Sequence, residues 1–85
     1  MKIEIGEKAA DLTFQDTFSK KTKCVHCSED AEIIYGSKED GELKHICMLH
    51  ENDPKGKGLW PHDNCAFVSY FCRKCGGVTT LWNQA

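Results

Sequence analysis

Four of the six cysteines in this 85-residue chain stand in two Cys-x-x-Cys pairs. The first pair is Cys24 and Cys27, and the second is Cys72 and Cys75. Two intervening residues form a tight turn that directs both sulfurs at one metal ion, which for zinc lies about 2.3 Å from each sulfur. Two such turns that face each other supply four thiolates in a tetrahedral arrangement. The spacing therefore predicts that all four cysteines bind one Zn²⁺ ion.

The second pair carries an additional signal, because Gly76 and Gly77 follow Cys75 directly. Glycine tolerates positive φ, so the chain can leave the turn with its backbone N–H groups directed back at the sulfurs. The same spacing also occurs in dithiol redox motifs and in disulfide frameworks. Redox motifs usually use one pair at the start of a helix, whereas here there are two pairs and neither opens an amphipathic helix. A shared metal is the favoured interpretation.

The two turns, and above all Cys72-Arg73-Lys74-Cys75-Gly76, resemble the knuckles of the zinc-ribbon superfamily, whose rubredoxin-like members hold iron in a similar cage of four cysteines. The resemblance covers the knuckles and the strands around them, and it implies a metal-bound β-hairpin fold. Such ribbons serve many different proteins, so the likeness leaves the partner open. Rubredoxin-like proteins often carry proline in the second knuckle, where this chain has Arg73 and Lys74, so zinc is preferred to iron.

The remaining pattern predicts a small, mainly-β, metal-stabilised domain with a zinc-ribbon-like antiparallel sheet of about four strands. In a chain of this length a single hydrophobic core rarely contributes more than about 3–5 kcal/mol to folding stability. A further stabilising element, such as a bound metal ion, is therefore needed. Gly36 and Gly41 delimit a turn cluster that would close a hairpin. Runs rich in β-branched and aromatic residues, or alternating in polarity, predict strands at 31–35, 42–49, 66–71 and 78–82.

We divide the chain into an N-terminal lead-in segment, residues 1–22, and a zinc-ribbon-like domain, residues 23–85. In the lead-in, Ala10, Phe14 and Phe18 recur at intervals of four, as on one face of a helix. Threonines at 13 and 17 are poor helix formers, so the alternative is an extended segment that lays Leu12, Phe14 and Phe18 over the ribbon.

A second group of ligand types stands between the two knuckles. Two pairs of one cysteine and one histidine lie there, each with two residues between its members. They are Cys47 with His50 and, in the reverse order, His62 with Cys65. Together they have the composition of a two-cysteine, two-histidine zinc site. An unbroken strand through His50 would point Cys47 and His50 to opposite faces, so the strand would have to curl. The alternative is that both cysteines are small buried apolar residues and that the histidines lie in loops.

The net charge of −2 gives no overall positive field for nucleic acid. A local basic patch would form if the lysines before the first knuckle met the tip of the second, and its members would be Lys20, Lys21, Lys23, Arg73 and Lys74. Basic residues near thiolates can equally offset the charge of the metal site. Trp82, in so small a protein, is expected to cover the core.

These observations favour a non-catalytic, zinc-binding interaction or regulatory module that binds protein. The first alternative is a nucleic-acid-binding ribbon, and the second is an iron electron-transfer protein. Four cysteines leave no open metal position for water, which argues against an enzyme. The first residues, Met1 to Gly6, contain no apolar signal, and no apolar run is long enough to span a membrane, so we expect a cytoplasmic protein with reduced thiols.

Overall fold

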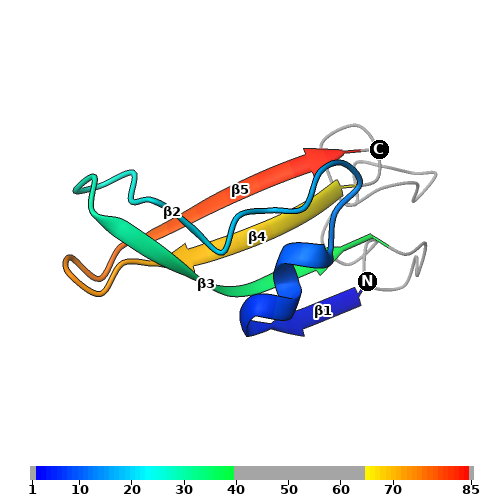
Figure 1. The fold of residues 1–85 in the computed structure, drawn as a ribbon, viewed down its shortest axis with the longest axis horizontal. Helices are drawn as coiled ribbons and strands as arrows, with labels where there is room; N and C mark the ends of the chain where they lie inside the picture. The colour runs from blue at the N-terminus through cyan, green and yellow to red at the C-terminus, as the bar shows by residue number, and fades with distance from the viewer. Residues whose placement is uncertain (1, 40–64, 85) are drawn as a thin grey trace, which may run out of the picture.

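The structure, a computed structural model, describes residues 2–39 and 65–84. They form one sheet and one short 3-10 helix (Figure 1). In chain order the elements are β1 (Lys2–Ile5), the 3-10 helix η1 (Gly6–Asp11), β2 (Lys21–Lys23), β3 (Asp30–Lys38), β4 (Cys65–Phe71) and β5 (Val78–Gln84).

The sheet is built around β3, the longest strand. One edge of β3 pairs with β4, which in turn pairs with β5. The other edge pairs with β1 over Tyr35 to Lys38 and with β2 over Asp30 to Glu32. All of these pairings are antiparallel, so the predicted small, mainly-β fold is confirmed, with five strands in place of about four.

The predicted strands at 31–35, 66–71 and 78–82 correspond to β3, β4 and β5. The predicted turn at 36–41 is wrong at its start, because Gly36 lies inside β3 and opposite Val68. A Cβ atom on Gly36 would lie 2.8 Å from the carbonyl oxygen of Phe67 and 3.1 Å from the Cβ of Ala9. Glycine is thus required there by close packing. The predicted strand at 42–49 lies outside the described residues.

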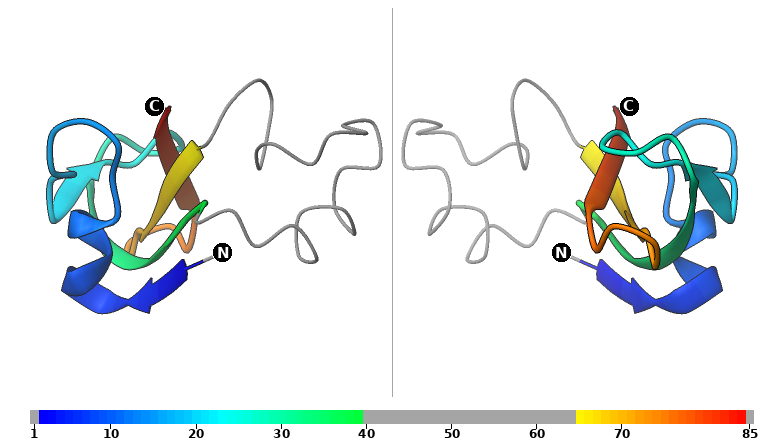
Figure 2. Two further views of the ribbon diagram at one scale, coloured as in Figure 1. Left: turned by 90° about the vertical axis from the view of Figure 1, so that its right-hand side faces the viewer. Right: turned by 90° about the vertical axis from the view of Figure 1, so that its left-hand side faces the viewer.

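The 3-10 helix η1 and the chain that follows it cover one face of the sheet (Figure 2). Ala9 and Ala10 of η1 are buried, and they belong to the same core cluster as Ile33, Val68 and Tyr70. The Tyr70 hydroxyl crosses this layer and donates a 2.6 Å hydrogen bond to the carbonyl oxygen of residue 19. Residues 6–20 thus bury one face of the ribbon, whereas the division of the chain at residue 22 stays a prediction.

The predicted helical face through Phe18 is wrong, because η1 ends at Asp11. Thr13 ends the helical path: its hydroxyl accepts a hydrogen bond from the N–H of Gln15 and donates one to the carbonyl oxygen of Asp16. Threonine makes such local bonds in competition with a helix. Phe18 nevertheless packs against the core, as the extended alternative predicts.

The opposite face of the sheet, called the open face below, carries a row of apolar side chains. Side chains alternate between faces along a strand, and the register places one set of alternate residues together on this face. They are Ile3, Ile5, Lys21, Glu32, Tyr35, Ser37, Phe67, Ser69, Phe71, Val78, Thr80 and Trp82, so a charged pair, Lys21 and Glu32, lies beside the apolar residues at the knuckle end. Six of these are large apolar residues that are 39–81% exposed.

The expectation that Trp82 is buried is therefore wrong. Its side chain is 47% exposed and packs against Phe67 on the neighbouring strand, with the ring centroids 6.4 Å apart. The physical reason is the alternation of side chains along β5. Thr79 is buried on the core side, and Trp82, three residues further on, therefore points to the opposite face. Within residues 2–39 and 65–84, no helix is long and apolar enough to cross a membrane.

Candidate metal centre

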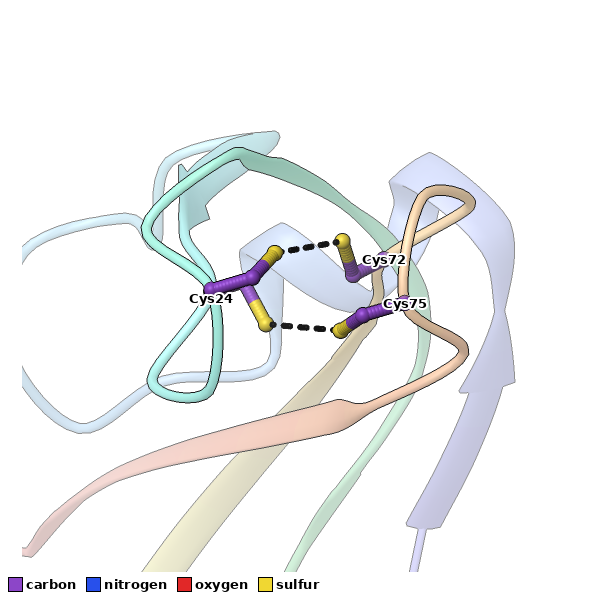
Figure 3. Close-up of side chains that lie close together, drawn as sticks. Cys24, Cys72 and Cys75 are labelled. Atoms are coloured by element: carbon purple, nitrogen blue, oxygen red, sulfur yellow. Dashed lines mark hydrogen bonds between the residues drawn. The ribbon is translucent and has the colours of Figure 1, made fainter.

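Two loops at one end of the sheet bring the four knuckle cysteines together (Figure 1). The first loop connects β2 to β3 and carries Cys24 and Cys27, and the second connects β4 to β5 and carries Cys72 and Cys75. Their four Sγ atoms all lie within 4.8 Å of one another. Across the loops, Cys24 Sγ lies 3.6 Å from Cys75 Sγ (Figure 3). Cys27 Sγ lies 3.5 Å from Cys72 Sγ.

These spacings match a four-coordinate site. Zinc–sulfur bonds of about 2.3 Å in a tetrahedron place neighbouring sulfurs about 3.8 Å apart. Figure 3 shows the sulfurs of Cys24, Cys72 and Cys75 directed into the space between the two loops. The cluster is therefore compatible with metal binding.

The two knuckles have the same hydrogen-bond pattern. In the first, the N–H of Ser28 donates to the carbonyl of Cys24 at 2.9 Å, and in the second the N–H of Gly76 donates to the carbonyl of Cys72 at 2.8 Å. Each knuckle is closed by a further bond, from the N–H of Cys24 to the carbonyl of Glu29 and from the N–H of Cys72 to the carbonyl of residue 77. Backbone hydrogen bonds therefore set the positions of the two cysteines within each knuckle.

Backbone N–H groups also point at the sulfurs, as the glycine-containing turn predicts. The N–H of His26 lies 3.4 Å from Cys24 Sγ, and the N–H of Gly77 lies 3.4 Å from Cys75 Sγ. Such partial positive charges stabilise thiolates. His26 itself is exposed, and its ring lies so close to Gly77 that a Cβ there would overlap it.

The pKa values divide the four thiols into two classes. The backbone N–H of His26 is the main cause that lowers the pKa of Cys24, to about 6. The N–H of Cys75 is the main cause that lowers the pKa of Cys72. For Cys27 the N–H of Glu29 lowers the pKa, but burial and the shared hydrogen bonds with the other sulfurs outweigh it and raise the pKa to about 12. The two thiols with a lowered pKa, Cys24 and Cys72, thus belong to different knuckles.

Cys75 completes the pattern. The N–H of Gly77 lowers its pKa, but the hydrogen bond with Cys24 is among the opposing causes, and the net pKa is raised. Each thiol with a raised pKa is thus paired across the loops with one whose pKa is lowered, Cys75 with Cys24 and Cys27 with Cys72. A divalent cation would displace the protons that remain on these sulfurs and be held by four thiolates.

Contacts between the loops and the fold connect the cluster to the core. Cys24 and Cys72 are buried members of the core cluster, and Cys27 packs against it. The N–H of Val25 donates to the Thr79 hydroxyl on β5 at 3.0 Å. Loss of the cluster geometry would therefore disturb the core directly.

The predicted basic residues lie near this end but are offset by carboxylates. Ion pairs join Lys74 to Glu29 at 3.0 Å, Lys23 to Asp30 at 2.9 Å, Arg73 to Glu32 at 3.3 Å and Lys20 to Glu7 at 3.3 Å. All of these side chains are largely exposed, so solvent screens each pair and the pairs add little to the stability of the fold. Their main effect is to cancel the local positive charge.

The predicted second site is only partly within the described residues. Cys47, His50 and His62 lie outside them. Cys65 is fully buried at the start of β4. Cys72 follows the end of the same strand, so Cys65 lies about 20 Å along the sheet from the four-cysteine cluster and is no part of it.

Two residues that shape the centre were missed from the sequence. Thr79 holds the first loop through its hydroxyl, and Ser28 adopts φ 66°, close to the φ 74° of Gly76 at the equivalent position. The position of Ser28 directly after Cys27, matching Gly76 after Cys75, is the signal that could have identified it.

This equivalence gives a testable prediction. A side chain at positive φ costs about 1–2 kcal/mol, which glycine avoids at an entropic cost of about 0.5–1 kcal/mol. We therefore expect Ser28→Gly to raise the free energy of unfolding by about 0.5–1 kcal/mol. Gly76→Ala should lower it by about 1 kcal/mol, although a Cβ there meets no atom within 4 Å. Chemical denaturation of the metal-loaded protein measures both, and effects of the same sign would contradict the equivalence.

Comparison with protein-family models, with curated proteins and with solved structures finds no match to this chain.

Proposed function

We propose that this protein is a zinc-binding, non-catalytic interaction module that presents its sheet to a protein partner. The observation that carries the proposal is the convergence of four cysteine sulfurs within 4.8 Å. An all-cysteine tetrahedral set is typical of structural zinc, and it supplies every ligand from the protein. No coordination position is then left for the water or substrate that zinc catalysis requires.

The open face supports the choice of a protein partner. Exposed apolar side chains are normal when scattered, but contiguous groups of them are typical of interaction sites. Here Tyr35, Phe71 and Trp82 share one face with two isoleucines and a valine. Tyrosine, tryptophan and phenylalanine are also the side chains enriched in protein interfaces.

Nucleic acid is the less supported partner. Four of the five predicted basic residues form ion pairs with carboxylates, so little unbalanced positive charge is left at the knuckles. A zinc ion bound by four thiolates would add a net charge of about −2 to this end. An electrophoretic shift assay at low salt should show no complex with either single- or double-stranded DNA or RNA. A complex whose affinity falls steeply with salt would reverse the choice.

Native mass spectrometry of protein purified without added metal tests the metal itself. We expect one or two zinc ions on the intact chain, with one of them lost in a Cys75→Ser variant. Two ions would extend the chemistry to the pairs Cys47 with His50 and His62 with Cys65. Iron, recognised by its mass and by a red colour, would favour the electron-transfer alternative. Protein that carries no metal would contradict the proposal.

A further inference from the structure

The two edges of the sheet are built differently. One edge is formed by β1 and β2, which are only four and three residues long and carry lysines at Lys2, Lys21 and Lys23. Short edge strands and lysines are the devices by which proteins prevent unwanted strand pairing. The other edge is β5, which has seven residues, Val-Thr-Thr-Leu-Trp-Asn-Gln, without a charge or a proline. Its register with β4 runs without a shift from Val78 to Gln84.

Among residues 2–39 and 65–84, no hydrogen bond occupies the backbone at the middle of the outer edge of β5. The hydrogen bonds that β5 makes outside β4 reach the side chains of Thr79 and Asn83 and the carbonyl of Gln84. The backbone of residues 80–82 receives none of these. An unpaired edge of this kind binds an extended strand through main-chain hydrogen bonds.

From this contrast we propose that two copies of the chain associate by antiparallel pairing of β5 with β5, with Thr80 facing Thr80 of the second copy on a two-fold axis. An axis perpendicular to the sheet makes the strands antiparallel and keeps both open faces on the same side. Opposed residues must then have the same parity, so Trp82 faces Val78 of the second copy. Pairing spans Val78 to Trp82 and leaves the bond between Gln15 and Gln84 in place.

This register is self-complementary on the open face. Within one copy, Phe71 pairs with Val78 and Phe67 pairs with Trp82. Across the axis, Val78 meets Trp82 of the second copy, so the two pairs join into a continuous apolar row of four side chains. The symmetry produces this row twice. No charged residue of β5 opposes itself, and threonine pairs well with threonine across antiparallel strands.

Moving the axis by one residue along β5, to Leu81, would keep the parity but place Trp82 opposite Thr80 of the second copy. The aromatic rows would then be broken. Pairing about Thr80 is therefore the arrangement that the open face favours.

Sedimentation equilibrium of the metal-loaded protein tests the association. We expect a monomer–dimer equilibrium for the natural sequence. Thr80→Lys and Thr80→Glu each place like charges opposite one another on the axis, so each should raise the dimer dissociation constant at least about tenfold. Thr80 is exposed in the single chain, but its hydroxyl is hydrogen-bonded to that of the buried Ser69 at 3.0 Å. Circular dichroism of both variants should therefore first show that the sheet is retained. A monomeric natural protein overturns the inference.

A charge-swap experiment tests the register. Thr80→Lys protein mixed with ¹⁵N-labelled Thr80→Glu protein should form the mixed dimer, identified by its mass in native mass spectrometry, because the introduced lysine of one copy then faces the introduced glutamate of the other. Failure of the mixture to associate overturns the placement of Thr80 on the axis. Tyr35→Lys is the matched control, since Tyr35 lies on the open face but on β3. This variant should still dimerise, and loss of its dimer would indicate face-to-face packing instead.

The inference deepens the proposed function by naming one protein partner, and it rests on that function only through the fold that the metal holds. The experiments distinguish failure of the dimer proposal from failure of the metal proposal. A zinc-loaded, folded monomer would leave the metal proposal standing, whereas a dimer without metal would contradict the metal proposal alone.

Discussion

Replacing Cys72 with serine is expected to unfold the protein. Cys72 is fully buried, it belongs to the core cluster, and its sulfur lies 3.5 Å from that of Cys27. Structural zinc contributes on the order of 10 kcal/mol to small domains, while a core of this size supplies only about 3–5 kcal/mol. If loss of one thiolate abolishes zinc binding, the free energy that is lost exceeds the stability that the core alone provides. Circular dichroism should show loss of the sheet, and metal content should fall by one ion.

Chelation of the natural protein should produce the same spectrum. Cys65→Ser is the matched control, because Cys65 is equally buried and lies on the strand that leads to Cys72, but outside the four-cysteine cluster. It should retain the zinc of that cluster and most of the sheet signal. An unchanged spectrum and full metal content in Cys72→Ser would contradict the metal-stapled fold.

The four-cysteine cluster could be predicted from the sequence because each half of it is local. A Cys-x-x-Cys turn fixes its own two sulfurs by bonds within a few residues, such as that from Gly76 to Cys72. The two halves need only meet once, and the pairing of β3 with β4 brings them together. Strands β3, β4 and β5 were predicted for the same reason, since their composition and alternation are local properties, whereas β2 was not predicted.

The features that were missed depend on contacts between distant segments. Whether Trp82 faces the core or solvent is decided by its parity relative to Thr79, which the first loop contacts across 54 residues of sequence. A turn is predicted at Gly36 because glycine is common in turns. The actual constraint on Gly36 is the approach of η1 and β4 from two sides, which no pattern around residue 36 records.

Gly36→Ala tests that constraint and is expected to cost about 2–3 kcal/mol of the free energy of unfolding, as overpacking of a core does. Unlike Gly76, Gly36 does not have a positive φ, so the cost comes from overlap with the carbonyl oxygen of Phe67 and the Cβ of Ala9. Chemical denaturation of the metal-loaded protein measures it. If residue 36 were an exposed turn residue, the same substitution would be neutral or slightly stabilising.

A double-variant cycle with Ala9→Gly identifies the cause. Removing the Ala9 methyl takes away the contact at 3.1 Å but leaves the Phe67 oxygen at 2.8 Å. We therefore expect the double variant to be more stable than the sum of the single effects predicts, by about 0.5–1 kcal/mol, while staying below the natural protein. Strict additivity would show that η1 does not press on β3 at this point. Partial recovery would show that the N-terminal segment and the ribbon form one core, held against the same strand whose start anchors the first knuckle.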